Sequence, residues 1–166
     1  MSAVKAEMGE LLVGAYLKEI EGCDFVDYNV RPAGGGLAGL NEIDVLGLRF
    51  SDKTVFLCEV TTHIRGALYG TYNETNRRIG KKFRRMRAYA KSSVRGFGKI
   101  RFMFWSPRVP EGKLMRSLER YKGLELVVNA GYRKKVEMLQ DRARKRKHDS
   151  GNPFFRALQI LGCLRG

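Results

Sequence analysis

Two acidic residues lie inside apolar runs of this sequence, where a charged side chain is uncommon. Asp44 occurs in NEIDVLGL and Glu59 in TVFLCEV, and both runs have the composition of buried strands. Because an unpaired charge is costly to bury, each carboxylate needs a partner. One candidate partner is an arginine. The other is a hard divalent cation such as Mg²⁺ or Mn²⁺, which takes oxygen ligands and needs only one or two protein carboxylates.

Three further residues could take part in chemistry beside this pair. Glu10 lies in an N-terminal apolar pattern of helical spacing and is followed by Gly14, which would let a helix approach a sheet closely. Thr61 and His63 follow Glu59 at alternate positions, so a strand through them would place all three side chains on one face. An imidazole titrates near neutrality, and His63 is therefore a candidate general base.

The positive charge of the chain is confined to its second part. Residues 1–63 contain 5 Lys/Arg and 10 Asp/Glu, a net charge of −5, whereas residues 64–166 contain 27 and 7, a net charge of +20. The segment 77–101 contains 11 Lys/Arg and no acid. Such a surface favours a polyanionic partner, and nucleic acid is the first candidate, ahead of an anionic membrane or an acidic protein.

Periodicity predicts the elements that would position these residues. In the first half we expect a helix over residues 4–20 and a strand over residues 25–30. A glycine-rich loop over residues 34–41 then leads into a tight hairpin, whose two strands cover residues 41–50 and 54–64. In the second half we expect helices over residues 71–91, 111–121 and 131–147, which alternate with strands over residues 99–106 and 124–129. An apolar tail follows over residues 152–166.

These elements predict an α/β fold with a central mixed β-sheet of about five strands flanked by helices, forming a single domain over residues 1–166. No apolar run reaches the length of a membrane span and the start of the chain lacks the apolar core of a signal peptide, so we expect a cytoplasmic protein without a membrane partner. Cys23, Cys58 and Cys163 lie far apart and are expected to be free thiols that bind no zinc.

The runs GELLVGAYLKEIEGCDFVDYNVRP, NEIDVLGL and VFLCEV resemble the PD-(D/E)XK nuclease superfamily, and most closely its resolvase-like branch. The resemblance covers residues 9–61. It implies a restriction-endonuclease-like fold and Mg²⁺- or Mn²⁺-dependent hydrolysis of phosphodiester bonds in DNA. It also implies that the metal ligands are the carboxylates of Glu10, Asp44 and Glu59 and the carbonyl group of Val60.

The sequence departs from this superfamily at the catalytic lysine, whose position is occupied by Thr61. A hydroxyl group can orient a water molecule but offers no positive charge to stabilise a developing hydroxide. Three alternatives follow: Lys81 or Lys82, on the next helix, supplies the ammonium group; His63 acts as the base; or catalysis is weak or lost and the fold survives as a module that binds DNA or RNA.

The helix expected over residues 71–91 is the first candidate surface for nucleic acid. Its cations would contact phosphates immediately beside the carboxylates; they are Arg77, Arg78, Lys81, Lys82, Arg84, Arg85 and Arg87. The apolar tail over residues 152–166 could either cover the core or meet a second subunit, and a homodimer is one expectation because duplex DNA has two strands to cut.

Overall fold

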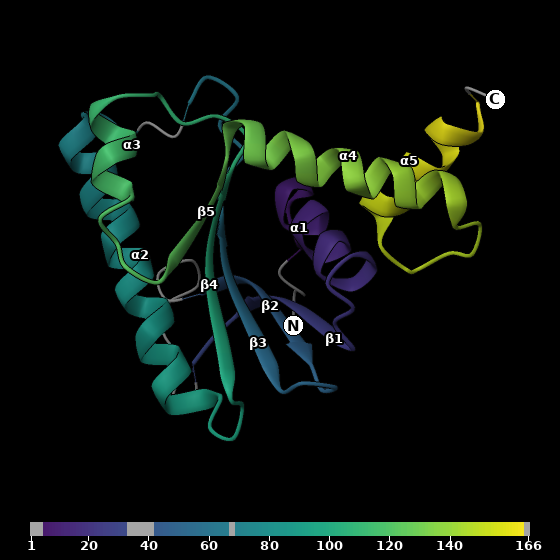
Figure 1. Ribbon diagram of the computed structural model, residues 1–166, viewed down its shortest axis with the longest axis horizontal. Coiled ribbons are helices and arrows are strands. Elements are labelled where there is room, and N and C mark those ends of the chain that lie inside the picture. Colours follow the sequence, from purple (N-terminus) through teal and green to yellow (C-terminus); the bar gives the residue numbers. More distant parts are fainter. Residues whose placement is uncertain (1–4, 33–41, 67–68, 165–166) are drawn as a thin grey trace.

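The computed structural model describes residues 5–32, 42–66 and 69–164, which form a five-stranded sheet with helices on both faces (Figure 1). The strands are β1 (Phe25–Val30), β2 (Ile43–Arg49), β3 (Thr54–Val60), β4 (Lys99–Ser106) and β5 (Leu124–Val128). The helices are α1 (Met8–Glu19), α2 (Tyr72–Ser93), α3 (Lys113–Leu118), α4 (Asn129–Lys145) and α5 (Pro153–Cys163).

The sheet is mixed, as the sequence predicts. Its strands follow the chain order β1-β2-β3-β4-β5, with antiparallel pairing from β1 to β3 and parallel pairing from β3 to β5. Helices α2 and α3 lie on one side of the sheet, and α1, α4 and α5 lie on the other (Figure 1). The prediction of an α/β fold with a mixed sheet flanked by helices is therefore confirmed.

Each face of the sheet is covered by apolar side chains that periodicity identifies. On the α2 face, Ile79, Phe83, Met86 and Ala90 are buried, as the helical spacing predicts. On the α1 face, Trp105 is fully buried, and the ring of Tyr16 lies edge-on with its centroid 5.2 Å away.

Helix α1 packs closely on the sheet because Gly14 has no side chain. A Cβ atom at this position would lie 2.0 Å from the hydroxyl oxygen of Tyr28 on β1. The close approach expected of Gly14 is thus confirmed.

Several predicted boundaries are wrong. Strand β3 ends at Val60, so Thr61 and His63 lie beyond it and do not extend the face that carries Glu59. Helix α3 is shorter than the predicted 111–121, and α4 begins two residues before the predicted start at Gly131. Helix α1 begins at Met8 rather than near the predicted Val4, because residues 5–7 are not helical. The glycine-rich loop predicted over residues 34–41 lies outside the described residues.

The apolar tail folds as helix α5, and one side of it covers the core. Asn152 caps the helix by accepting a hydrogen bond from the backbone N–H of Phe155, and its amide donates to the carbonyl oxygen of Leu11 on α1. Phe155 is fully buried, whereas Leu161 and Leu164 remain 55% and 77% exposed. Within the described ranges, no helix is long and apolar enough to span a membrane.

We expect the Phe155→Ala substitution to lower the free energy of unfolding by about 3–5 kcal/mol, because it opens a cavity in the core. Leu164→Ala is the matched control and should change it by no more than about 0.5 kcal/mol, since this side chain is exposed. Urea unfolding followed by circular dichroism measures both. A loss below about 1 kcal/mol for Phe155→Ala would show that α5 does not contribute to the core.

Candidate active site

Asp44 and Glu59 occupy neighbouring positions on two antiparallel strands. Val45 of β2 pairs with Cys58 of β3, so the two acidic residues are the next pair in the register. The Asp44 carboxylate accepts a hydrogen bond of 2.7 Å from the backbone N–H of Val60. The hairpin therefore brings the two carboxylates together, as the sequence predicts.

Two cations from α2 bind the carboxylate of Glu59. The Lys82 ammonium Nζ lies 2.6 Å from one oxygen of Glu59, and the Arg85 guanidinium lies 2.8 Å from the other. Lys82 Nζ is also 3.7 Å from an oxygen of Asp44. Because Lys82 and Arg85 are three residues apart on a helix, both reach the same point of the sheet. Lysine 82 thus lies between the two carboxylates.

Burial makes the charges of this cluster strongly interdependent. The side chain of Glu59 is 1% exposed and that of Asp44 is 16% exposed. Burial, together with the neighbouring Glu59 carboxylate, raises the pKa of Asp44 to about 7. Burial alone would lower the pKa of Lys82, but the two carboxylates outweigh it and leave this pKa above its usual value. Lys82 is therefore charged at neutral pH.

Glu10 lies on α1 and has hydrogen-bond partners of its own. Its carboxylate accepts hydrogen bonds from the backbone N–H of Glu7, at 2.9 Å, and from the amide of Asn29, at 3.1 Å. Burial raises the pKa of Glu10. The residue borders an open pocket of about 210 Å³ whose lining includes Val60 and Thr61. Its role as a third metal ligand stays a prediction.

Thr61 and His63 lie at the same pocket as Glu10. Thr61 is buried, and its backbone N–H donates to the carbonyl oxygen of Trp105. The imidazole of His63 is exposed and packs edge-on against Tyr69, with ring centroids 5.3 Å apart. Of Lys81, Lys82 and His63, Lys82 is thus the one that contacts both strand carboxylates.

The remaining cations of α2 lie on its outer side. We call this the outer α2 surface. Arg78 and Arg87 lie over the rings of Tyr69 and Phe83, with the guanidinium carbon 4.7 and 5.8 Å from the ring centroids. The members of this surface, all exposed, are Arg77, Arg78, Lys81, Arg84, Arg87 and Lys91.

The sequence carried a signal that separates Lys82 from Lys81. At about 100° per residue, Lys82 lies about 60° around the helix from the core residue Ile79, whereas Lys81 lies about 160° away. The sequence indicates an arginine as one candidate partner of Glu59 without identifying Arg85, although the spacing of Lys82 and Arg85 places both on one helix flank. Of the two alternatives for Glu59, a salt bridge or a metal ion, the structure shows the salt bridge.

Comparison with protein-family models, with curated proteins and with solved structures finds no match for this chain.

The residues present can be tested for their fit to a divalent cation. In the part of the chain that the structure describes, no group of three His, Cys, Asp or Glu side chains lies close enough together to hold a metal ion. The pair formed by Asp44 and Glu59 nevertheless provides hard oxygen ligands in the number that Mg²⁺ commonly takes from a protein. Donor chemistry therefore fits, while Lys82 and Arg85 currently neutralise the same oxygens.

The raised pKa of Asp44 predicts how stability depends on pH. A carboxyl group whose pKa is higher in the folded than in the unfolded state binds more protons when folded, so ionising it is destabilising. The contribution of Asp44 to the free energy of unfolding should therefore fall as the pH rises from about 4 to about 7, and then level off. Relative to the native protein, Asp44→Asn should become more stable by on the order of 4 kcal/mol between pH 4 and pH 8.

Urea unfolding at several pH values measures this difference. The contrasting variant is Asp52→Asn: Arg49 lowers the pKa of Asp52, so the stabilising contribution of this carboxylate is lost only below about pH 4, and the variant should show no trend between pH 4 and pH 8. A difference between Asp44→Asn and the native protein that does not change with pH would show that Asp44 titrates normally.

Proposed function

We propose that this protein is a metal-dependent nuclease that hydrolyses phosphodiester bonds of DNA, with a restriction-endonuclease-like fold in which Lys82 replaces the lysine missing at Thr61. One observation carries the proposal: the Lys82 ammonium lies 2.6 Å from Glu59 and 3.7 Å from Asp44. The resemblance over residues 9–61 supports it. So does the order of elements, in which a helix and three antiparallel strands precede α2 and a parallel strand.

Each group of the site would have a separate task. Asp44 and Glu59 would hold Mg²⁺ or Mn²⁺, with the Val60 carbonyl group and water as further ligands, and Glu10 would approach from α1. When bound, such an ion polarises the scissile phosphate and lowers the pKa of an attacking water. Lys82 would then orient that water and stabilise the developing negative charge with its ammonium group. The outer α2 surface would bind the phosphates on either side of the cleaved bond.

A second function is favoured by the pairing of Glu59 with two cations. Both of its oxygens are already engaged by Lys82 and Arg85, so a metal ion must displace at least part of this pairing. If it cannot, the carboxylates are structural, and the protein is a nucleic-acid-binding module that uses the outer α2 surface without cutting DNA or RNA. The two functions share a binding surface and differ in metal binding.

We expect Lys82→Met to reduce metal-dependent cleavage of labelled DNA by about a hundredfold or more, because the positive charge beside the attacking water is lost. Lys81→Met should reduce cleavage much less, because it removes one of several phosphate contacts of the outer α2 surface and leaves the ammonium group beside Glu59 in place. Gel assays with duplex, nicked and single-stranded DNA, in Mg²⁺, Mn²⁺ or EDTA, measure the rates. An identically purified Asp44→Asn/Glu59→Gln variant excludes contaminating nuclease. Full activity of Lys82→Met would contradict the assignment of Lys82.

We expect Arg85→Met to bind Mn²⁺ about tenfold more tightly than the native protein, because one charge-assisted hydrogen bond no longer competes for Glu59. Isothermal titration calorimetry measures the affinity without any cleavage. Arg84→Met is the matched control, since Arg84 is an exposed neighbour on the outer α2 surface. Absence of Mn²⁺ binding in all three proteins, with and without DNA, would favour the binding module over the nuclease.

A further inference from the structure

A second group of cations lies where α4 ends and α5 packs against it. Residues 142–148 read RARKRKH and lie exposed at the surface, apart from Ala143. A pocket of about 520 Å³ opens between the two helices. Its basic lining residues are Arg144, Arg146, Lys147 and Arg156. No part of the proposed nuclease function uses this group.

Some of these cations are already paired and others are available. Arg146 forms a salt bridge with the buried Glu19, and Arg144 pairs with the exposed Asp141. Among the described residues, Lys145, Lys147 and Arg156 have no ion pair with a carboxylate. We call these three residues the α4–α5 surface. Their charges are therefore free to meet an anionic ligand.

The chemistry of this surface favours a phosphodiester backbone. Lys147 and Arg156 line the walls of a hollow, which an extended phosphate strand can enter more readily than a flat bilayer can. A second copy of the chain would bring like charges together across a symmetric contact. Exposed Ile160, Leu161 and Leu164 lie nearby on α5 or just after it, and they are the feature that would suit lipid instead.

The α4–α5 surface and the outer α2 surface lie on opposite sides of the sheet. Helices α4 and α5 extend away from the sheet on the side of α1, whereas α2 runs along the other side (Figure 1). Because the sheet separates them, a straight nucleic-acid segment that lies along α2 does not reach α4 and α5. A ligand at the second surface is therefore a different segment.

We propose that the α4–α5 surface binds the phosphate backbone of a second nucleic-acid segment, so that one protein molecule joins two segments. This inference rests on the nucleic-acid binding that the proposed function assigns to the outer α2 surface. It adds a bridging activity that requires neither the carboxylates nor a metal ion.

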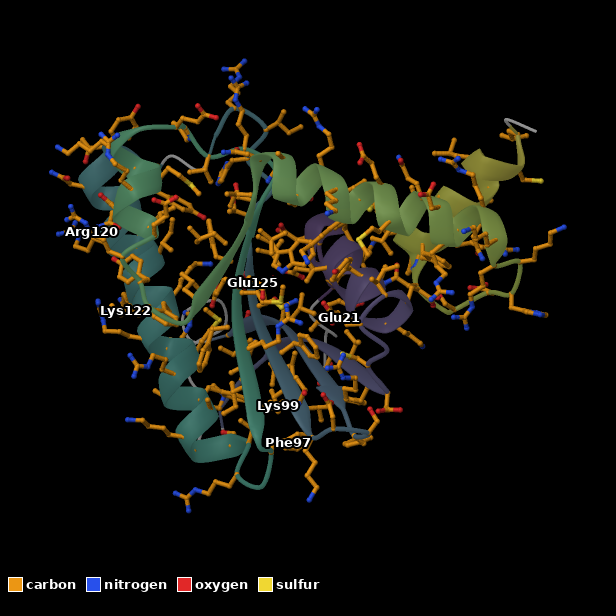
Figure 2. All side chains as sticks on the ribbon, in the orientation of Figure 1. Glu21, Phe97, Lys99, Arg120, Lys122 and Glu125 are labelled. Atoms are coloured by element: carbon orange, nitrogen blue, oxygen red, sulfur yellow. The ribbon has the colours of Figure 1, made fainter. Side chains whose placement is uncertain are left out.

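Capture of a fluorescent duplex by a bead-bound duplex tests the proposal, in EDTA so that no DNA is cleaved. Three variants each lose three exposed charges. The first variant removes the α4–α5 surface and carries Lys145→Gln, Lys147→Gln and Arg156→Gln. The second removes part of the outer α2 surface and carries Arg77→Gln, Lys81→Gln and Arg84→Gln. The third is a control that carries Lys113→Gln, Arg120→Gln and Lys122→Gln; Arg120 and Lys122 lie beside α2 and α3, far from α4 and α5 (Figure 2).

We expect the native protein and the control variant to capture the second duplex, and the α4–α5 variant to lose capture by about tenfold or more while it still binds a single duplex. An equimolar mixture of the α4–α5 and α2 variants should not restore capture, because each molecule has only one intact surface. Restored capture would show that several copies assemble to join the duplexes, and would overturn the proposal.

Two further outcomes count against the inference in different ways. If the α4–α5 variant captures DNA normally but no longer binds vesicles containing phosphatidylglycerol, the surface binds membranes and the inference fails while the proposed nuclease function stands. If the native protein binds no duplex at all, the proposed function fails together with the inference.

Discussion

Glu59 carries its charge on a face of the sheet that is otherwise covered by aliphatic and aromatic side chains, and α2 must be placed so that this charge is balanced. Each carboxylate oxygen has its own cation, from Lys82 and Arg85. Removing one partner of a buried ion pair typically costs about 3–5 kcal/mol, because a charge is left uncompensated. The rotation of α2 about its axis is therefore set by two requirements at once: Ile79 and Met86 must reach the core, and the two cations must reach Glu59.

Three different flanks of α2 face the core, the two carboxylates and the solvent. This division links stability to the proposed chemistry, since the cations that neutralise the buried Glu59 bind the same oxygens that a metal ion would need. A phosphate backbone offers Lys82 and Arg85 alternative partners of the same charge as Glu59. Metal and nucleic acid would then favour each other's binding through a shared exchange of ion pairs, as linkage requires.

The adjacency of Asp44 and Glu59 could be predicted from the sequence because a short turn between two apolar runs leaves one simple pairing. The core residues of α2 could be predicted because their spacing follows the helical period. Other features depend on distant partners: β3 ends at Val60 although residues 61–64 keep a strand-like composition. Glu10 turns back to the N–H of Glu7 and to Asn29, contacts that periodicity does not reveal. The composition of the apolar tail does not decide whether it covers the core or meets a second subunit, because this depends on how α5 packs against the rest of the protein.

Helix α5 also bears on the order in which this protein folds. The hydrogen bond from Asn152 to the carbonyl oxygen of Leu11 joins residues 141 positions apart, and Phe155 completes the core on the α1 face. Contacts of such long sequence separation close a large loop and form slowly compared with local ones. During synthesis, the part of the apolar surface of α1 that α5 covers therefore stays exposed until α5 has been made. The interval in which this surface could meet another chain is set by the length of the polypeptide between the two helices.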